Sequence, residues 1–254
     1  MEEFGVVYYT DGNPHFQKML DASVASLRRF HAGWPVKVFT VPTPKLSLLR
    51  KVYRMLTPGK NVKRRERCGQ DTRTIARKAD IVLETPFTHT LYLDVDTIIM
   101  QSLDQIRQWV SHYDLIITPL PWAEYKRVAE WQPDTWPRVM AGVFAYNERF
   151  RLAYERMVVK FGGSEGIARI YNTDQYVLSL LCRLSKDELM IKYWPDFQID
   201  TVCIDKHLGT SDYPKIDGKI DIRSPLLKRF RIFHYNEYKT AYMQQIRTYW
   251  GYNL

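Results

Sequence analysis

Hydrophobic and polar positions along the chain follow two different periods. Short apolar runs with strand character are separated by longer stretches in which apolar residues recur every three to four positions, as on one face of a helix. The predicted strands cover residues 5–10, 36–41, the stretch around 91, 114–120, 138–147, 190–195, 201–204 and 229–235. The predicted helices cover residues 16–30, 69–84, 102–110, 148–161 and 173–186. Strands that alternate with helices are typical of an α/β domain with a mostly parallel sheet.

One predicted strand carries two charges in an otherwise apolar setting. Residues 91–100 read LYLDVDTIIM, so that Asp94 and Asp96 stand one residue apart within an apolar run. A buried carboxylate without a partner is costly, and two within a few ångströms repel each other. Mg²⁺ or Mn²⁺, which prefer hard oxygen ligands, would balance this charge. Because open α/β sheets bind ligands at the carboxyl ends of their strands, the pattern predicts a metal site there.

Composition sets broad limits on the protein class. The chain has 254 residues, of which 45% are hydrophobic and 26% are charged, as in an ordinary globular protein of one large or two small domains. No apolar run approaches the ~20 residues that span a bilayer. The three cysteines are odd in number and widely spaced, which favours a reducing compartment over a disulfide framework or a zinc site. We therefore expect the protein in the cytoplasm.

The net charge of +9 is unevenly distributed. Residues 45–67 contain nine Lys or Arg against one Glu, a pattern that suits a solvated loop, a phosphate-bearing donor, an anionic membrane surface or a nucleic acid. The tail at 241–254 mixes aromatic residues with an arginine. It fits either a helix lying at a membrane surface or a terminal helix packed on the core.

Five stretches together resemble a known enzyme family. They are LYLDVDTIIM (91–100), IARKAD (75–80), VMAGVFAYN (139–147), YNTDQYVLSLL (171–181) and FHYNEYK (233–239). Their order resembles the GT-A glycosyltransferases, and most of all the retaining family that includes glycogenin and bacterial lipooligosaccharide galactosyltransferases. The resemblance implies the GT-A fold, a Rossmann-like nucleotide-diphospho-sugar transferase fold with a mostly parallel central sheet flanked by helices. It also implies one domain over 1–254, with a nucleotide-binding half (1–100) ending in D-x-D and an acceptor- and sugar-binding half (101–254).

The resemblance also implies a metal site and catalytic residues. Asp94, Asp96 and His234 correspond to the ligands of Mn²⁺ or Mg²⁺, and Asp94 also faces the donor's sugar or ribose. Asp174 and Gln175 correspond to the D-Q pair beside the reactive carbon and the acceptor. From the residues alone, Asp174 also suits the N-terminus of a helix, where its charge is favourable.

The remaining donor contacts come from the same resemblance. Residues assigned to the donor, which the family takes as a nucleotide sugar and most often a UDP-sugar, are Tyr9, Thr10, Asp11, Arg77, Ala141, Gly142 and Lys239. Two positions depart from the family pattern. Met140 stands where the family usually has Asn, and Glu237 stands where it has Gly. The first departure leaves the donor sugar open, and the second bears on Lys239.

The resemblance implies a Mn²⁺-dependent, retaining glycosyltransferase that moves a hexose from a UDP-hexose to a glycan, a lipid-linked or a protein acceptor. We expect an anionic membrane contact and no nucleic-acid partner. Two other classes stay open. LDVDTI also resembles the phosphotransfer motif of haloacid-dehalogenase-like phosphatases, with Asp94 as nucleophile, although the late acidic pair of those enzymes is missing. The basic charge also suits a nucleic-acid-binding protein, or a glycosyltransferase that acts on a modified nucleobase.

Overall fold

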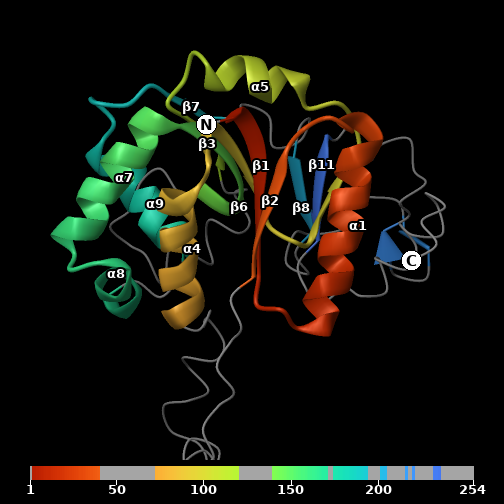
Figure 1. Cartoon of the computed structure of the whole chain (residues 1–254), viewed down its shortest axis with the longest axis horizontal. Helices are drawn as coiled ribbons and strands as arrows, with labels where there is room; N and C mark the ends of the chain where they lie inside the picture. The colour runs from red at the N-terminus through yellow and green to blue at the C-terminus, as the bar shows by residue number, and fades with distance from the viewer. Residues whose placement is uncertain are drawn as a thin grey trace, which may run out of the picture.

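A twisted central sheet organises the molecule (Figure 1). The computed structural model describes residues 2–40, 72–119, 139–170, 174–193, 201–204, 215–216, 219–220 and 231–235. Within them the sheet has the strand order β2-β1-β3-β6-β5-β7. The bounds are β1 Glu2–Thr10, β2 Val36–Thr40, β3 Phe87–Leu93, β5 Leu115–Pro119, β6 Val139–Asn147 and β7 Ile191–Tyr193. Among these strands only β6 runs antiparallel to its neighbours, which confirms the predicted α/β fold with a mainly parallel sheet.

The apolar run around residue 91 forms two strands instead of one. β3 ends at Leu93, residues 94–96 turn, and β4 (Thr97–Ile99) begins. β4 joins a second sheet with the order β4-β11-β8, in which β8 spans Thr201–Ile204 and β11 spans Ile232–Tyr235. A short hairpin pairs β9 (Lys215–Ile216) with β10 (Lys219–Ile220). The two aspartates therefore lie in the turn that passes from one sheet to the other.

Helices lie to both sides of the central sheet. Their bounds are α1 Pro14–Phe30, α4 Thr72–Glu84, α5 Asp104–Val110, α7 Glu148–Lys160, α8 Ser164–Ile170 and α9 Asp174–Leu184. In Figure 1, α4, α7, α8 and α9 lie on one side of the sheet and α1 lies on the other. The pattern of apolar residues did not predict α8. The helix predicted at 102–110 begins at Asp104 in the structure, two residues later than predicted.

Two apolar clusters fix the helices to the sheet. Along β1, Val7 and Tyr9 belong to the cluster that contains α4, α7 and α9, while Val6 and Tyr8 belong to the cluster that contains α1 and α5. Because alternate residues of a strand face opposite sides, a strand covered on both faces reads as a continuous apolar run. This explains why residues 5–10 are almost all apolar. Polar groups gather instead at the ends of the strands.

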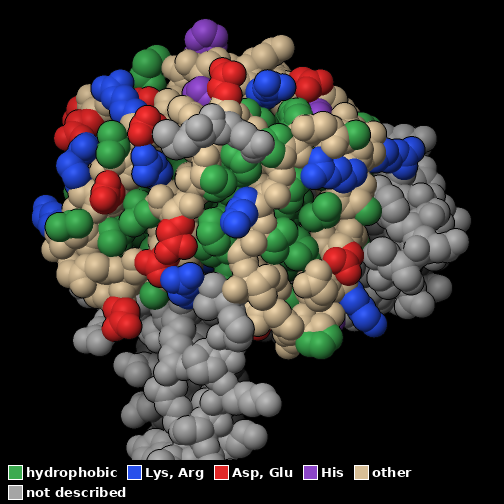
Figure 2. Space-filling view, in the orientation of Figure 1, with side chains coloured by type: hydrophobic (Ala, Val, Ile, Leu, Met, Phe, Trp, Pro, Cys, Tyr) green, Lys and Arg blue, Asp and Glu red, His purple; other side chains and the backbone are tan. Residues whose placement is uncertain are grey.

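The described surface carries both signs of charge. Figure 2 shows acidic and basic side chains interspersed around a region of apolar side chains on the face toward the viewer. The basic segment 45–67, the tail at 241–254 and Lys239 lie outside the described residues, so the predictions made for them stay predictions. Within the part of the chain that the structure describes, no helix combines the length and apolarity needed to cross a membrane.

Candidate functional site

The pairing of three strands brings the site together at one edge of the sheet. β1 and β3 are parallel with Tyr8 opposite Leu93, and β6 is antiparallel to β3 with Val143 opposite Leu93. The turn after Leu93 therefore lies between the carboxyl end of β1 and the start of β6. This edge is where open α/β sheets bind ligands, as the sequence predicted for the D-x-D pair.

Asp94, Asp96 and His234 form a compact cluster of candidate metal ligands. One ligand atom from each side chain lies within 4.8 Å of the other two. His234 Nε2 is 3.0 Å from Asp96 Oδ1 and 3.9 Å from Asp94 Oδ2. Ligands around a Mg²⁺-sized ion lie on the order of 3 to 4 Å apart, given metal–oxygen distances of about 2.1 Å. The two carboxylates at this spacing suit Mn²⁺ or Mg²⁺, and the imidazole offers one further, nitrogen ligand.

The second sheet delivers His234 to this cluster. β11 pairs antiparallel with β4, and His234 stands opposite Thr97, directly after the D-x-D turn. The Thr97 hydroxyl donates a 2.7 Å hydrogen bond to the backbone carbonyl of Asp94. Ser23 of α1 contacts both Thr97 Oγ1, at 3.0 Å, and the hydroxyl of Tyr8, at 3.1 Å. A buried chain of hydroxyls therefore ties the turn to α1 and β1.

Gly142 leaves the space that His234 and Asp94 occupy. A Cβ at Gly142 would lie 2.9 Å from both Asp94 Oδ2 and His234 Nδ1, and closer still to His234 Cε1. Its carbonyl accepts a 2.7 Å hydrogen bond from the backbone N–H of Asp94. The β5–β6 register shifts in the same part of β6, opposite Ile117–Pro119. Such irregularities often redirect a strand beside a functional site. Gly142, predicted to contact the donor sugar, thus packs directly against two of the candidate metal ligands, Asp94 and His234.

Two neighbouring groups hold the other oxygen of Asp94. Asp94 Oδ1 accepts hydrogen bonds from Lys78 Nζ and from the hydroxyl of Tyr92, both at 2.9 Å. Burial lowers the pKa of Lys78, but the carboxylates of Asp174 and Asp94 together raise it by more than burial lowers it. The net pKa of Lys78 therefore lies well above its usual value. Burial, followed by the charge of Asp94, raises the pKa of Tyr92 well above its usual value. Both groups are therefore protonated donors at neutral pH.

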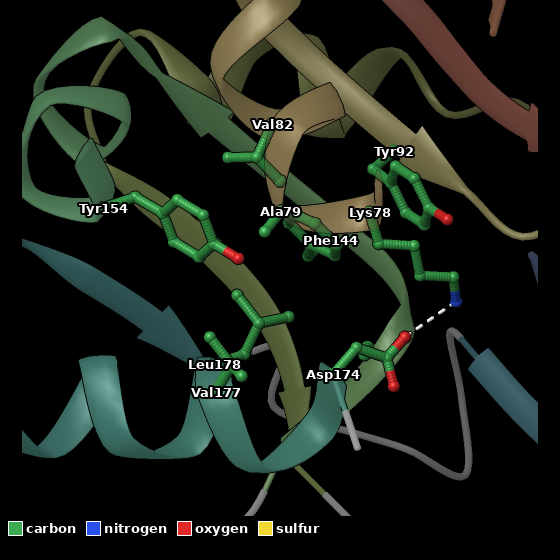
Figure 3. Close-up of a pocket in the computed structure, with 10 residues that line it drawn as sticks. Lys78, Ala79, Val82, Tyr92, Phe144, Tyr154, Asp174, Val177 and Leu178 are labelled. Atoms are coloured by element: carbon green, nitrogen blue, oxygen red, sulfur yellow. Dashed lines mark hydrogen bonds and ion pairs between the residues drawn. The ribbon is translucent and has the colours of Figure 1, made fainter. Parts of the chain in front are cut away.

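Lys78 links the cluster of candidate metal ligands to the start of α9. Its Nζ lies 2.7 Å from Asp174 Oδ2, and Figure 3 shows the ammonium directed at this carboxylate. Asp174 is the first residue of α9, and its Oδ1 accepts a 2.9 Å hydrogen bond from the backbone N–H of Gln175. Asp94, Lys78 and Asp174 therefore form a continuous chain of alternating charge. Gln175 lies beside it and is half-buried.

A small cavity lies behind the Lys78–Asp174 pair, between α4, α9 and the sheet. It measures about 20 Å³, enough for roughly one water molecule. The lining is mostly apolar and comprises Lys78, Ala79, Val82, Tyr92, Ala141, Phe144, Tyr154, Asp174, Val177 and Leu178. Figure 3 shows the Tyr154 hydroxyl directed into it. Ala141, predicted to contact the donor sugar, is buried in this wall.

The predicted nucleotide contacts lie at the carboxyl end of β1. Tyr9 and Thr10 are buried, and Thr10 Oγ1 accepts a 3.2 Å hydrogen bond from the N–H of Gly12. Asp11 Oδ1 accepts a 2.8 Å hydrogen bond from the N–H of Asn13, which caps α1. These bonds shape the loop between β1 and α1. The nucleotide contacts assigned to Tyr9, Thr10 and Asp11 stay predictions.

Arg77 and Lys78 differ in where they point. The guanidinium of Arg77 pairs with Asp80 at 2.9 Å and with Glu84 at 3.9 Å, on its own helix. Its neighbour Lys78 reaches Asp94 and Asp174 instead. The donor contact assigned to Arg77 stays a prediction, and the sequence analysis missed Lys78.

The two missed residues, Lys78 and Tyr92, both left a signal in the sequence. Lys78 stands at helical spacing from Ile75 and Val82, so that a charge interrupts an apolar stripe. Tyr92 precedes Asp94 by two positions, the spacing that places two residues on one face of a predicted strand. In both cases a polar group sits on the side of the element that faces the site.

Comparison with solved structures identifies the fold. No family model and no curated protein matches this sequence. The structure is similar to that of the galactosyltransferase LgtC in complex with donor and acceptor sugar analogues, with 14% identity, a TM-score of 0.51, and coverage of 91% of this chain and 87% of that chain. It is also similar to the bifunctional glycosyltransferase WbbM, with 11% identity, a TM-score of 0.54, and coverage of 92% of this chain and 46% of that chain. The chain thus has the GT-A glycosyltransferase fold that the sequence predicted.

Proposed function

We propose that this protein is a glycosyltransferase. It moves a hexose from a nucleotide-diphosphate sugar, with UDP as the first expectation, to a glycan, a lipid-linked or a protein acceptor. The reaction depends on Mn²⁺ or Mg²⁺ and retains the configuration at the anomeric carbon. The observation that carries the proposal is the Asp94–Asp96–His234 cluster at the carboxyl edge of a GT-A sheet. The solved structure of LgtC with donor and acceptor sugar analogues supports the substrate class.

Sugar transfer demands charge of both signs within a few ångströms. The bond from the anomeric carbon to the diphosphate breaks, the acceptor's hydroxyl oxygen bonds to that carbon, and the hydroxyl proton passes to the departing diphosphate. During this exchange negative charge grows on the leaving diphosphate and positive charge grows on the anomeric carbon. A divalent cation held by Asp94, Asp96 and His234 would supply a Lewis acid for the diphosphate. The carboxylate of Asp174 is the candidate for stabilising the positive carbon, and Gln175 is the candidate for orienting the acceptor.

Lys78 adds a fixed positive charge between these two regions. Its ammonium lies 2.9 Å from Asp94 and 2.7 Å from Asp174, so it holds the two carboxylates at a fixed separation. Fixed dipoles and charges of this kind stabilise a transition state without reorganising during the reaction.

The first test is a donor screen. Isothermal calorimetry and thermal shift would compare UDP-, GDP- and dTDP-sugars, with and without Mn²⁺, on the wild type and on Asp94→Asn/Asp96→Asn. We expect Mn²⁺-dependent binding of one nucleotide sugar, lost in the double variant. If no nucleotide sugar binds and the protein instead releases phosphate from a generic phosphoester, the aspartates serve a phosphatase and the proposal is wrong.

The stereochemistry has its own test. Once a donor is known, NMR of the product's anomeric proton shows directly whether the configuration is kept. A product with inverted configuration would remove the retaining part of the proposal and leave the transferase part intact.

A further inference from the structure

The two oxygens of Asp94 are engaged by different parts of the protein. Oδ1 accepts hydrogen bonds from both Lys78 Nζ and the Tyr92 hydroxyl, each at 2.9 Å. Oδ2 is the oxygen that lies 3.9 Å from His234 Nε2, on the side of the metal cluster. One oxygen is thus supplied with two protein donors, and the other faces the place of the ion.

We infer that Tyr92 and Lys78 hold Asp94 as a ligand with a single available oxygen, and that this sets the cation preference of the site toward Mn²⁺ and Mg²⁺ over Ca²⁺. The inference rests on the metal site of the proposed function. It concerns positioning residues, since both groups act on the ion through Asp94.

Tyr92 is well placed for this role because it is rigid. It is 1% exposed within β3, and its ring stacks on Phe144 with centroids 4.9 Å apart. It lies next to the last residue of β3, and its hydroxyl reaches Asp94 Oδ1, just beyond the end of the strand. A buried aromatic ring with few rotamers holds its hydroxyl in one place, and the carboxylate rotamer follows from that hydrogen bond.

Lys78 reaches the same oxygen from another element. Its side chain is 12% exposed and extends from α4 past the Tyr92 ring, with Nζ 5.7 Å from the ring centroid. Because its ammonium also binds Asp174, it is held between two carboxylates and stays close to Asp94. The two donors come from α4 and β3, so the position of Asp94 Oδ1 is set by the packing of these elements and not by the turn alone.

The consequence for cation choice follows from coordination chemistry. Ca²⁺ collects six to eight oxygens and often takes a carboxylate through both oxygens, whereas Mg²⁺ accepts an octahedral set and keeps several waters. A carboxylate with one oxygen engaged offers Ca²⁺ one ligand fewer. Releasing Oδ1 would therefore favour Ca²⁺ more than it favours Mn²⁺.

Metal titration tests this without any turnover. Mn²⁺ binding would be followed by electron paramagnetic resonance of the free ion, and Ca²⁺ binding by displacement of Mn²⁺. The variants are Tyr92→Phe and Tyr92→Phe/Lys78→Met. The matched control is Tyr146→Phe, because Tyr146 is equally buried and also stacks on Phe144, yet its hydroxyl bonds the Val82 carbonyl instead.

We expect the ratio of the Ca²⁺ to the Mn²⁺ association constant to rise several-fold in Tyr92→Phe. In the double variant the rise should be roughly tenfold, as for other groups that orient a metal ligand. The control should keep the wild-type ratio. A wild type that binds Mn²⁺, with both variants at its ratio, overturns this inference and leaves the proposed function standing. A wild type whose Mn²⁺ binding is no tighter than that of Asp94→Asn/Asp96→Asn removes the metal site, and the inference fails with it. If the double variant does not fold, Tyr92→Phe alone decides.

Discussion

Replacing Gly142 with alanine should dismantle the metal cluster by adding a single methyl group. The new Cβ would lie 2.9 Å from Asp94 Oδ2 and 2.9 Å from His234 Nδ1. Carbon atoms normally keep about 3.5 Å or more from such neighbours. The His234 ring is 6% exposed and sits on a strand paired with β4, so neither it nor the turn can yield without losing other contacts.

The expected magnitude follows from two separate effects. Overpacking a buried position costs about 1 to 3 kcal/mol of folding free energy. Moving His234 or Asp94 by several tenths of an ångström takes a ligand out of its narrow range of metal distances. We therefore expect Mn²⁺ affinity to fall by at least about tenfold, as when a group that orients a metal ligand is removed.

The assay pairs a stability measurement with a binding measurement. Chemical denaturation gives the unfolding free energy, and Mn²⁺ titration of the folded protein gives the affinity. Gly33→Ala is the matched control, because a Cβ at Gly33 meets nothing within 4 Å. A second arm uses Gly142→Ala/His234→Ala, in which the ring that the methyl group would strike is absent.

The effects of the two substitutions on stability should be coupled. The stability cost of Gly142→Ala should be smaller in the His234→Ala background, since neighbouring substitutions couple when they share a contact. If Gly142→Ala binds Mn²⁺ like the wild type and is as stable as Gly33→Ala, the close packing of Gly142 does not matter and the argument is refuted.

Three further outcomes are expected. His31 accepts a 2.8 Å hydrogen bond from the N–H of Leu103, and burial lowers its pKa although a nearby carboxylate raises it. Its contribution to stability is therefore complete above about pH 6.5 and is lost as the pH falls through the lowered pKa. Between about pH 7 and pH 5, His31→Gln should lose less unfolding free energy than the wild type, as measured by chemical denaturation. Equal losses in the two proteins would contradict this account. Asp114 is 5% exposed and accepts one backbone and one side-chain hydrogen bond. Asp114→Ala should therefore cost about 3 kcal/mol of unfolding free energy. A cost under about 1 kcal/mol would show that those bonds are dispensable. Thr97→Val removes the donor to the Asp94 carbonyl at nearly constant volume and should weaken Mn²⁺ binding about threefold or more, whereas unchanged binding would mean that the turn holds itself.

Local patterns in the sequence were sufficient for much of the fold. The alternation of strands and helices indicated an α/β domain because burial on both faces of a parallel sheet leaves continuous apolar runs, as in residues 5–10. The cost of two adjacent carboxylates in such a run identified Asp94 and Asp96 as the place of a site. His234 came from resemblance, and it lies 3.0 Å from Asp96. The ligand roles of all three residues stay a proposal.

Other features were decided by contacts between distant residues. The run around residue 91 divides between two sheets because β4 finds a partner in β11, more than 130 positions along the chain. A pattern of apolar residues does not contain that pairing. The small helix α8 was missed because its seven residues are too few for a clear period.

The choice between Arg77 and Lys78 shows most clearly what the tertiary structure adds. Consecutive residues on a helix point about 100° apart, so the rotation of α4 against the sheet decides which one enters the site. That rotation is set by the packing of Ala79 and Val82 into the core, and it sends Lys78 to Asp94 and Asp174. The sequence by itself determined the alternation of strands with the longer helices and the place where negative charge must be balanced, because periodicity and the cost of burying charge are local properties. Only the tertiary structure decided that the ammonium of Lys78, and not the guanidinium of Arg77, lies against Asp94, because this depends on how separate elements pack together.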